Sequence, residues 1–429
     1  MESLVIDGGY KLHGSVRVQG AKNGVLPVLA ATVLGGRSVI HNCPRLSDID
    51  NSLEILRMLG CKAEREGDTV TVDARCVSRC DIPPELMRRM RSSVIFLGAV
   101  LARCGRAVVS VPGGCELGPR PIDLHLYAMR RMGAEIAEEH GLIVCETCGR
   151  LHGAEIALSF PSVGATENTI IAASVAQGRT VLTGAAREPE IVELAEMINA
   201  MGGRVRGAGG DVIVIDGVEA LGDCEHTCIP DRIAAATYIS AAAVTGSELT
   251  LRGVRREHMV SVISVFEQAG CRFSYGHGEL TVYAPPRLIA VSDIRTMPYP
   301  GFPTDAQAVV AAALATACGT SMITETVFGN RFGYMCELAR MGADVRVDGR
   351  IAVIRGVKSL CGAETECTDL RGGAALVVAA LGANGRSTVR SLHHIDRGYE
   401  SMEAEFSALG AKIYRNVTDE TEFTEKCFR

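Results

Sequence analysis

The chain of 429 residues contains no tryptophan, and aromatic residues make up only 4% of it. It therefore lacks the aromatic stacking platforms on which single-stranded nucleic acids usually bind. No basic tract stands out either, and the formal net charge is −6. Nucleic-acid binding through a basic surface is not expected.

Long apolar segments are also missing. The longest apolar helical runs, such as residues 309–318, are shorter than the ~20 residues that span a bilayer. The N-terminal stretch MESLVIDGGYKLHG has no basic segment followed by an apolar one, so it does not resemble a secretory signal. We therefore expect a cytoplasmic protein without membrane insertion.

Several catalytic motifs have no counterpart in the sequence. It contains no GxxxxGK[ST], no GxGxxG after a strand, no HExxH and no GxSxG. These absences disfavour nucleotide hydrolysis, hydride transfer, zinc proteolysis and serine-esterase chemistry.

The sixteen cysteines do not predict a disulfide framework, because a long chain without a secretory signal is expected to keep its thiols reduced. A zinc site is conceivable, since Cys145 and Cys148 form a CxxC pair and Cys224 and Cys228 flank His226. The two pairs are 76 residues apart, however, with no second CxxC. Scattered apolar thiols are the favoured interpretation, and we expect neither a metal nor a cofactor.

A sixfold repeat organises the chain. A glycine followed by a β-rich run recurs every 66 to 73 residues, and a second glycine ends a helical pattern 23 to 28 residues after each first one. The first set is Gly36, Gly105, Gly178, Gly246, Gly319 and Gly385, and the second is Gly60, Gly133, Gly202, Gly270, Gly342 and Gly410.

Each repeat predicts the same elements. A small-residue apolar helix, such as 233–244 or 306–318, precedes the first glycine, and an amphipathic helix precedes the second. Alternating strands follow, as in the hairpin pattern of residues 345–356. Helices that are apolar nearly all round must be buried, so we predict an α/β fold with helices inside and sheets outside. Six such units suit two domains of three better than one ring.

Polar residues gather at two places in the repeat. The first is the start of each buried helix, where capping explains Ser162, Thr304, Asp305 and Asp369 but not cations. A cation at a helix N-terminus interacts unfavourably with the helix dipole, and a bound anion would offset this cost. The cations at these positions are Lys22, Arg232 and Arg371. The second place is the loop after each first strand. All six loops carry arginine, including Arg120, Arg331 and Arg397, which indicates a small anionic ligand.

Two residues are candidates for proton transfer. Cys115 lies in the glycine-rich loop PGGCELGPRP, where Arg120 favours the thiolate. Asp305 follows the apolar residues PGF, whose desolvating effect suits a general base, although a helix cap is an equal alternative.

The ordered motifs of the chain resemble those of the UDP-N-acetylglucosamine 1-carboxyvinyltransferases, the enolpyruvyl transferases that open peptidoglycan precursor synthesis. The likeness extends from about Leu4 to Ile413. The motifs are Gly20–Ala31, Pro112–His125, Pro161–Asn168, Ala185–Val192, Ile229–Ile233, Pro300–Ala308, Glu325–Phe332, Thr368–Val377 and His394–Glu400.

The resemblance implies two inside-out α/β barrel-like domains of three repeats each. It places residues 22–229 in an N-terminal lobe that binds the UDP-sugar and carries the Cys115 loop. Residues 1–21 and 230–429 would form a C-terminal lobe carrying Asp305, Arg331 and Arg397, with the active site in the cleft between the lobes.

The resemblance also implies a reaction. The enolpyruvyl group of phosphoenolpyruvate passes to the sugar 3′-hydroxyl through a tetrahedral ketal, and phosphate leaves. Cys115 would protonate the enol carbon and be the target of fosfomycin, Asp305 would take the hydroxyl proton, and Lys22 would assist. Phosphoenolpyruvate would contact Lys22, Asn23, Arg120, Arg331, Arg371 and Arg397, with Asp369 a further polar position. The UDP-sugar would contact Asn23, Arg91, Arg120, Pro121, Ile122, Asp123, Leu124, Ser162, Val163, Gly164, Asp305 and Val327.

Two positions depart from the family pattern. Phe160 stands where some relatives have a basic residue, so uridine or diphosphate contacts are expected to differ. Glu116 follows Cys115 directly, and its carboxylate should raise the pKa of that thiol.

Two other functions remain as alternatives. The shikimate-pathway enolpyruvyl transferase shares the fold, but its hallmark Asn-Ala-Gly-Thr-Ala stretch is absent. A non-catalytic paralogue that binds UDP-sugar would be favoured by loss of Cys115 or Asp305, and both are present.

Overall fold

The computed structural model describes residues 2–110 and 122–417. These residues divide into two compact units. The N-terminal unit comprises residues 19–110 and 122–230, and the C-terminal unit comprises residues 2–18 and 231–417. Each unit has its own hydrophobic core.

Each unit is built from three repeats of helices and strands. The N-terminal unit contains α1 (Lys22–Ala31), η1 (Thr32–Leu34), β3 (Arg37–His41), α2 (Ser47–Met58), β4 (Lys62–Glu66), β5 (Thr69–Asp73), α3 (Pro84–Arg89), η2 (Arg91–Ile95), α4 (Phe96–Cys104), β6 (Arg106–Ser110), α5 (Asp123–Arg131), β7 (Glu135–Glu139), β8 (Leu142–Glu146), β9 (Glu155–Ala157), α6 (Val163–Ser174), β10 (Arg179–Thr183), α7 (Pro189–Ala200), β11 (Val205–Arg206), β12 (Val212–Asp216) and β13 (Cys224–Thr227).

The C-terminal unit follows the same plan. It contains β1 (Glu2–Asp7), β2 (Ser15–Arg17), α8 (Arg232–Thr245), β14 (Glu248–Arg252), η3 (Arg256–His258), α9 (Val260–Gln268), β15 (Arg272–Gly276), β16 (Glu279–Tyr283), β17 (Ile294–Arg295), α10 (Thr304–Leu314), β18 (Thr320–Thr324), α11 (Met335–Arg340), β19 (Asp344–Asp348), β20 (Ile351–Arg355), β21 (Glu364–Glu366), α12 (Leu370–Gly382), β22 (Arg386–Arg390), η4 (Leu392–Arg397), α13 (Met402–Ala408) and β23 (Lys412–Val417).

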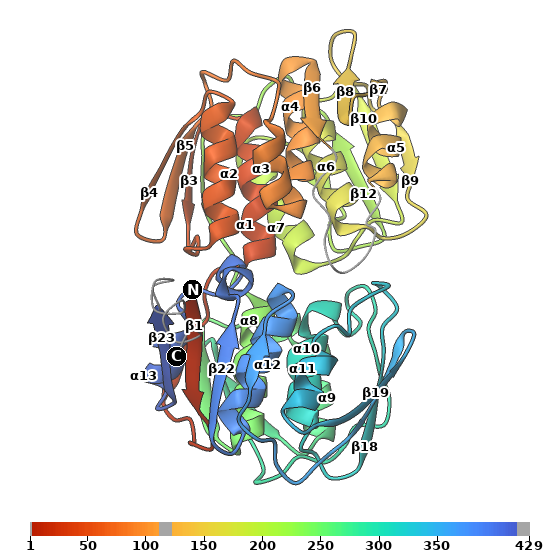
Figure 1. Ribbon diagram of the computed structural model, residues 1–429. Helices are drawn as coiled ribbons and strands as arrows, with labels where there is room; N and C mark the ends of the chain where they lie inside the picture. The colour runs from red at the N-terminus through yellow and green to blue at the C-terminus, as the bar shows by residue number, and fades with distance from the viewer. Residues whose placement is uncertain (1, 111–121, 418–429) are drawn as a thin grey trace. The chain divides into compact units, whose positions relative to one another are not determined.

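The alanine-rich helices form the centre of each unit. In the C-terminal unit α8, α10 and α12 pack against one another, as Figure 1 shows. In the N-terminal unit α1, α4 and α6 are the corresponding helices. Residues 306–314 of α10 are all buried, because small apolar side chains on every face let neighbouring helices approach. The apolar run continues to Cys318, but the helix ends at Leu314 and the chain turns there, earlier than the sequence predicts.

The strands form six separate sheets, one for each repeat. In the described residues five sheets have four strands and the sheet β6-β8-β7 has three. Five of these sheets contain an antiparallel hairpin, and β19–β20 confirms the hairpin predicted over residues 345–356. The second glycine of every repeat lies at φ between +91° and +102°, a conformation that suits glycine and ends the helix. The predicted fold class, with buried helices and outer sheets in six repeats, is confirmed.

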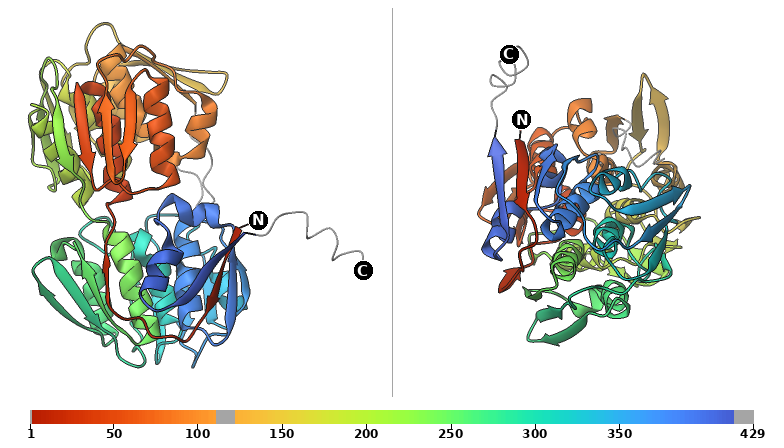
Figure 2. Two further views of the ribbon diagram at one scale, coloured as in Figure 1. Left: turned by 90° about the vertical axis from the view of Figure 1, so that its left-hand side faces the viewer. Right: turned by 60° about the horizontal axis from the view of Figure 1, so that its bottom comes forward.

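The two ends of the described chain lie in one sheet. β1 runs antiparallel between β22 and β23 and completes the sheet of the last repeat, as Figures 1 and 2 show. β13 similarly pairs with β3, and β2 with β14, in parallel. Within the described residues, no helix is both long and apolar enough to cross a membrane.

Candidate functional site

The first candidate residues lie at the start of α1. Lys22 opens this helix with its side chain only 9% exposed, and its Nζ lies 2.6 Å from Oδ2 of Asp48 at the start of α2. The Asp48 side chain is 3% exposed. A buried ammonium at a helix N-terminus would be strongly destabilising alone, so Asp48 provides its counter-charge. Asn23 follows Lys22 and is half-buried.

The residues expected to contact the sugar nucleotide meet where α5 and α6 begin. Ile122 and Asp123 stand at the start of α5, followed by Leu124, and Ser162 caps α6 by accepting a bond from the Ala165 N–H. Gly164 lies close to His125, and a Cβ on this glycine would be only 3.0 Å from the imidazole. The free N–H groups at such a helix start can bind an anion.

His125 holds this arrangement together. Its Nδ1 lies 2.7 Å from the Asn168 Nδ2, while the same amide donates to the Val94 carbonyl and accepts from the Gly98 N–H. Burial and the charge of Arg91 lower the pKa of His125 to about 4. The imidazole is therefore neutral at pH 7, and Nδ1 accepts the amide proton. Arg91, which begins η2, is half-buried.

In the C-terminal unit, Asp305 is held by two buried arginines. Arg331 Nη2 lies 2.8 Å from Asp305 Oδ1, and Arg371 Nη2 lies 2.9 Å from Oδ2. The arginine side chains are 3% and 4% exposed, whereas that of Asp305 is 26% exposed. Asp305 therefore faces solvent, while the cations behind it do not.

The structure tests one of the two interpretations of Asp305, that of a helix cap. The residue before α10 is Pro303, and neither Thr304 nor Asp305 caps the helix with its side chain. The Asp305 carboxylate instead faces the arginines. The capping interpretation is therefore wrong for both residues, whereas Ser162, Asp231 and Asp369 do cap their helices.

Arg371 belongs to a wider polar network. Its Nη1 lies 3.5 Å from the Tyr399 hydroxyl, which lies 2.8 Å from Oγ1 of Thr237. Burial alone would lower the pKa of Arg371, but the charge of Asp305 raises it above its usual value. Arg371 therefore keeps its charge although it is buried.

Glu325 organises the backbone around Asp305. This 1%-exposed carboxylate accepts a bond from Thr304 Oγ1 at 2.8 Å, and from the N–H groups of Val327 and Phe328 at 2.8 and 3.0 Å. It also accepts from Thr296 Oγ1 at 2.9 Å. One buried group thus fixes both the start of α10 and the loop that contains Val327.

Asp369 and Arg397 are the remaining candidates of the C-terminal unit. Asp369 caps α12 by accepting from the N–H groups of Arg371 and Gly372. Arg397 ends η4 and is half-buried. Its neighbour Asp396 accepts two bonds from Arg415 on β23, which anchors η4 to that strand.

Four residues of interest lie outside the described residues. They are Cys115, Glu116, Arg120 and Pro121. The exposed side chain of Phe160, at 44%, stands where some relatives were expected to have a basic residue.

The zinc site considered from the cysteine spacing is not formed in that way. All described cysteines are free thiols; Cys145 is buried in the core while Cys148 is exposed. The pairs 145/148 and 224/228 do not come together in the described chain. His226 and Cys228 instead group with Glu193.

Sequence reasoning missed four residues that shape the site. Asp48, His125 and Glu325 all lie inside the motifs or loops used above, and Tyr399 lies in the last motif. Nothing in the sequence pairs any of these residues with its partner, because each contact joins segments that are distant along the chain.

Comparison with known proteins identifies the family. Residues 6–406 match the family model for EPSP synthase (3-phosphoshikimate 1-carboxyvinyltransferase). UDP-N-acetylglucosamine 1-carboxyvinyltransferase 2 of Caldanaerobacter subterraneus is 51% identical over 97% of this chain and 100% of that protein. UDP-N-acetylglucosamine 1-carboxyvinyltransferase 1 of Symbiobacterium thermophilum is 49% identical over 96% of this chain and 95% of that protein.

Solved structures agree in fold. The enolpyruvyl transferase NikO from Streptomyces tendae superposes with a TM-score of 0.87 at 28% identity, covering 97% of this chain and 99% of that one. EPSP synthase from Acinetobacter baumannii gives 0.76 at 20% identity, covering 97% of this chain and 100% of that one, which supports the fold alone. The chain therefore belongs to the UDP-N-acetylglucosamine 1-carboxyvinyltransferases of the enolpyruvyl transferase family.

Proposed function

We propose that this protein transfers the enolpyruvyl group of phosphoenolpyruvate to the 3′-hydroxyl of UDP-N-acetylglucosamine, with release of phosphate, in peptidoglycan precursor synthesis. The observation that carries the proposal is the near-full-length identity to relatives named for this activity. We place this reaction in the cytoplasm.

The geometry around Asp305 supports its role as the proton acceptor. Its carboxylate is the most exposed member of a cluster whose two cations are buried. A general base must reach the hydroxyl proton within hydrogen-bond distance, which an exposed carboxylate on a helix start can do. Thr304 and Glu325 keep that helix start in place.

The two arginines have a second task in this proposal. Arg331 and Arg371 neutralise Asp305 in the free protein, and both match phosphoenolpyruvate-binding positions. A phosphate or carboxylate bound beside them would share their donors, because guanidinium groups suit both anions. Asp305 would then keep less of their charge and be a stronger base when the substrate is present.

The proposed reaction adds and then eliminates. The sugar 3′-oxygen bonds to C2 of the enol while Asp305 takes its proton, and Cys115 delivers a proton to C3. Loss of a C3 proton and departure of phosphate then restore the double bond. The preorganised cations Lys22, Arg120, Arg331, Arg371 and Arg397 would stabilise the anionic groups of the intermediate.

The N-terminal unit would bind the nucleotide sugar. The starts of α5 and α6 offer backbone N–H groups to a diphosphate, and His125 stays neutral beside them. The proposed contacts are Asn23, Arg91, Arg120, Pro121, Ile122, Asp123, Leu124, Ser162, Val163 and Gly164, with Asp305 and Val327 from the C-terminal unit.

The test is phosphate release from phosphoenolpyruvate with and without UDP-N-acetylglucosamine, for the wild type and Cys115→Ala. We expect release that requires the sugar nucleotide and falls sharply in the variant. No release by the wild type would contradict the function, whereas sugar-dependent release that survives in Cys115→Ala would remove only the role of Cys115. A mass shift of the Cys115 peptide with fosfomycin tests the same thiol directly.

A further inference from the structure

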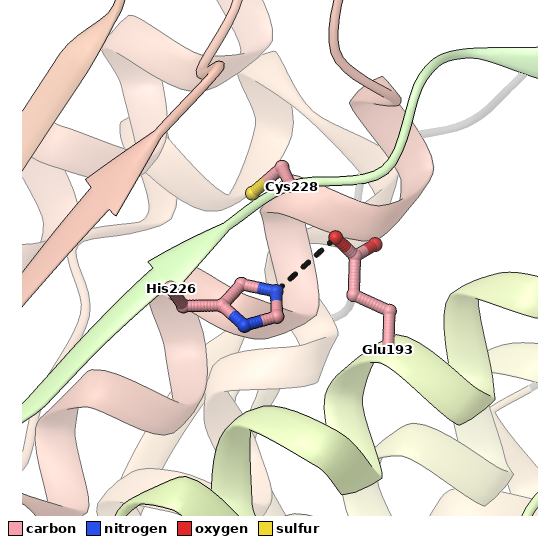
Figure 3. A group of neighbouring side chains, drawn as sticks. All are labelled: Glu193, His226 and Cys228. Atoms are coloured by element: carbon pink, nitrogen blue, oxygen red, sulfur yellow. Dashed lines mark hydrogen bonds and ion pairs between the residues drawn. The ribbon is translucent and has the colours of Figure 1, made fainter. Parts of the chain in front are cut away.

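Three potential metal ligands converge in the N-terminal unit, apart from every residue given a role above. They are Glu193 on α7, His226 on β13, and Cys228 just after that strand (Figure 3). One carboxylate oxygen, one ring nitrogen and Sγ all lie within 4.8 Å of one another. Glu193 and Cys228 are buried, and the His226 side chain is 12% exposed.

The fold explains why these residues meet. Alternate residues of an extended segment face the same side, which brings Cys228 to the side of the chain on which the His226 ring faces Glu193 of α7. The backbone of Cys228 is fixed, since its N–H donates to the His41 carbonyl and its own carbonyl accepts from Asn42 Nδ2. Cys224, two residues before His226, does not belong to the group.

Hydrogen bonding explains only one oxygen of the carboxylate. Oε1 of Glu193 accepts from the Ile229 N–H at 2.7 Å and lies 3.3 Å from His226 Nε2. Oε2 is buried without a hydrogen-bond partner in the described protein. A buried carboxylate oxygen without a hydrogen bond destabilises the fold, so a purely structural role does not explain a carboxylate at this position.

We propose that Glu193, His226 and Cys228 bind one thiophilic divalent cation, chemically Zn²⁺. A sulfur, an imidazole nitrogen and a carboxylate oxygen are the three ligand types that zinc takes in proteins, and water supplies a fourth position. The ligands of this site belong to none of the residues proposed for phosphoenolpyruvate or the sugar nucleotide.

Binding requires two proton changes. The Cys228 thiol must lose its proton to solvent, because only the thiolate binds zinc. His226 must present an unprotonated Nε2, so its remaining proton moves to Nδ1. The Ile229 N–H stays on Oε1 and orients the carboxylate as a ligand. Burial, with Glu193 nearby, raises the pKa of the Cys228 thiol, so that proton is still present before the cation binds.

The site lies next to the segments where the chain passes between the units. The Ile229 carbonyl accepts from the Ala21 N–H at 2.7 Å, and Pro230 pairs with Gly20. Glu193 Oε2 also lies against Gly24 of α1, the residue after Asn23, in the space that a Cβ would occupy. A bound cation would therefore fasten α7 to both crossing segments and stabilise the start of α1.

The test uses the full, reduced chain after dialysis against a chelator, titrated with Co²⁺ and then Zn²⁺. We expect one tight Co²⁺ equivalent with thiolate-to-cobalt charge-transfer absorption, displaced by Zn²⁺, and a higher Tm. Cys228→Ser should lose the absorption, whereas Cys224→Ser, which removes another buried thiol at the start of β13, should keep it. Absence of the band in the wild type, or its survival in Cys228→Ser, would overturn the proposal.

Two further measurements keep the test decisive if Cys228→Ser does not fold. Glu193→Gln retains an oxygen acceptor for the Ile229 N–H but loses the charge, and should weaken Co²⁺ binding at least tenfold. Zinc X-ray absorption on the wild type should show one sulfur at about 2.3 Å with nitrogen or oxygen at about 2.0 Å. Several sulfurs would assign the metal to other thiols, a spectrum without sulfur would exclude Cys228 as a ligand, and either result would overturn the site.

Discussion

One buried helix start in each unit carries a compensated charge, and the sign of that charge differs between α1 and α10. In the N-terminal unit Lys22 begins a buried helix and is neutralised by the more deeply buried Asp48. In the C-terminal unit Asp305 stands at a buried helix start and is neutralised by two arginines buried behind it. In both units the charge at the helix start, Lys22 or Asp305, is the more exposed member of its ion pair. The repeat thus fixes where the charge lies, while its sign and its partners differ between the units.

The largest effect is expected from removing the exposed charge of the C-terminal unit. Asp305→Asn keeps a side chain that can bond to one arginine but cannot accept the hydroxyl proton, so kcat should fall by about 10²- to 10⁴-fold. Single-turnover phosphate release measures it. Asp344→Asn is the matched control, since that aspartate also pairs with an arginine but on the surface. A kcat for Asp305→Asn close to that of the control would refute the assigned role.

The corresponding change in the N-terminal unit should act on stability as well. Lys22→Met removes the ammonium beside the buried Asp48 carboxylate, which should lower the free energy of unfolding of that unit by about 3–5 kcal/mol. Adding Asp48→Leu should recover most of this loss without restoring activity. Chemical denaturation followed with activity assays separates the two effects.

An exposed lysine provides the control for this experiment. Lys412 lies over the Tyr10 ring with Nζ 4.3 Å from its centre. Lys412→Met should change the unfolding free energy by less than about 1 kcal/mol. If Lys22→Met were as mild as this control, the buried pair would not be the compensated charge described above.

A smaller effect, confined to the N-terminal unit, is the dependence of its stability on pH. The pKa of His125 is about 4 when folded against an ordinary value of 6.5, so the unfolded chain binds an extra proton between these values. Stability from this residue is complete above pH 6.5 and is lost as the pH falls towards 4, by up to about 3 kcal/mol. Denaturation of wild type and His125→Gln between pH 4 and 8 measures the difference, which should shrink at low pH. A difference independent of pH would contradict the neutral imidazole.

The smallest effect is expected from changing Glu325 in the C-terminal unit. Glu325→Gln retains an oxygen that accepts from the Val327 and Phe328 N–H groups. It loses the negative charge that strengthens these hydrogen bonds, a loss of about 1 kcal/mol. We expect KM for the sugar nucleotide to rise about fivefold with kcat nearly unchanged. Steady-state kinetics test this against Glu364→Gln, a surface carboxylate paired with Arg390. A loss of kcat alone would show that Glu325 acts on Asp305 instead of the Val327 loop.

The fold could be predicted because its determinants are local. Alanine-rich helices such as α10 must be buried, and a glycine at a fixed offset ends each amphipathic helix, so six repeats are visible without any long-range contact. The insertion of β1 between β22 and β23 depends on pairing residues nearly 400 positions apart, such as Val5 and Thr388. Spacing within the repeat cannot encode such a pairing.

The candidate site could be predicted only in part. Lys22 and Arg371 stood out because a cation at a helix start opposes the dipole. Their partners did not stand out, since Asp48 is an ordinary acidic residue in the first turn of α2. Glu193 likewise gave no signal on α7, and only the fold brings it to His226 and Cys228.

The most direct test of the account offers the enzyme two acceptors in parallel. Phosphoenolpyruvate is supplied with either UDP-N-acetylglucosamine or shikimate 3-phosphate, and released phosphate and the mass of the product are measured together. We expect phosphate release and an enolpyruvyl-bearing product with the sugar nucleotide alone. Product formed from shikimate 3-phosphate, or no product from the sugar nucleotide, would contradict it.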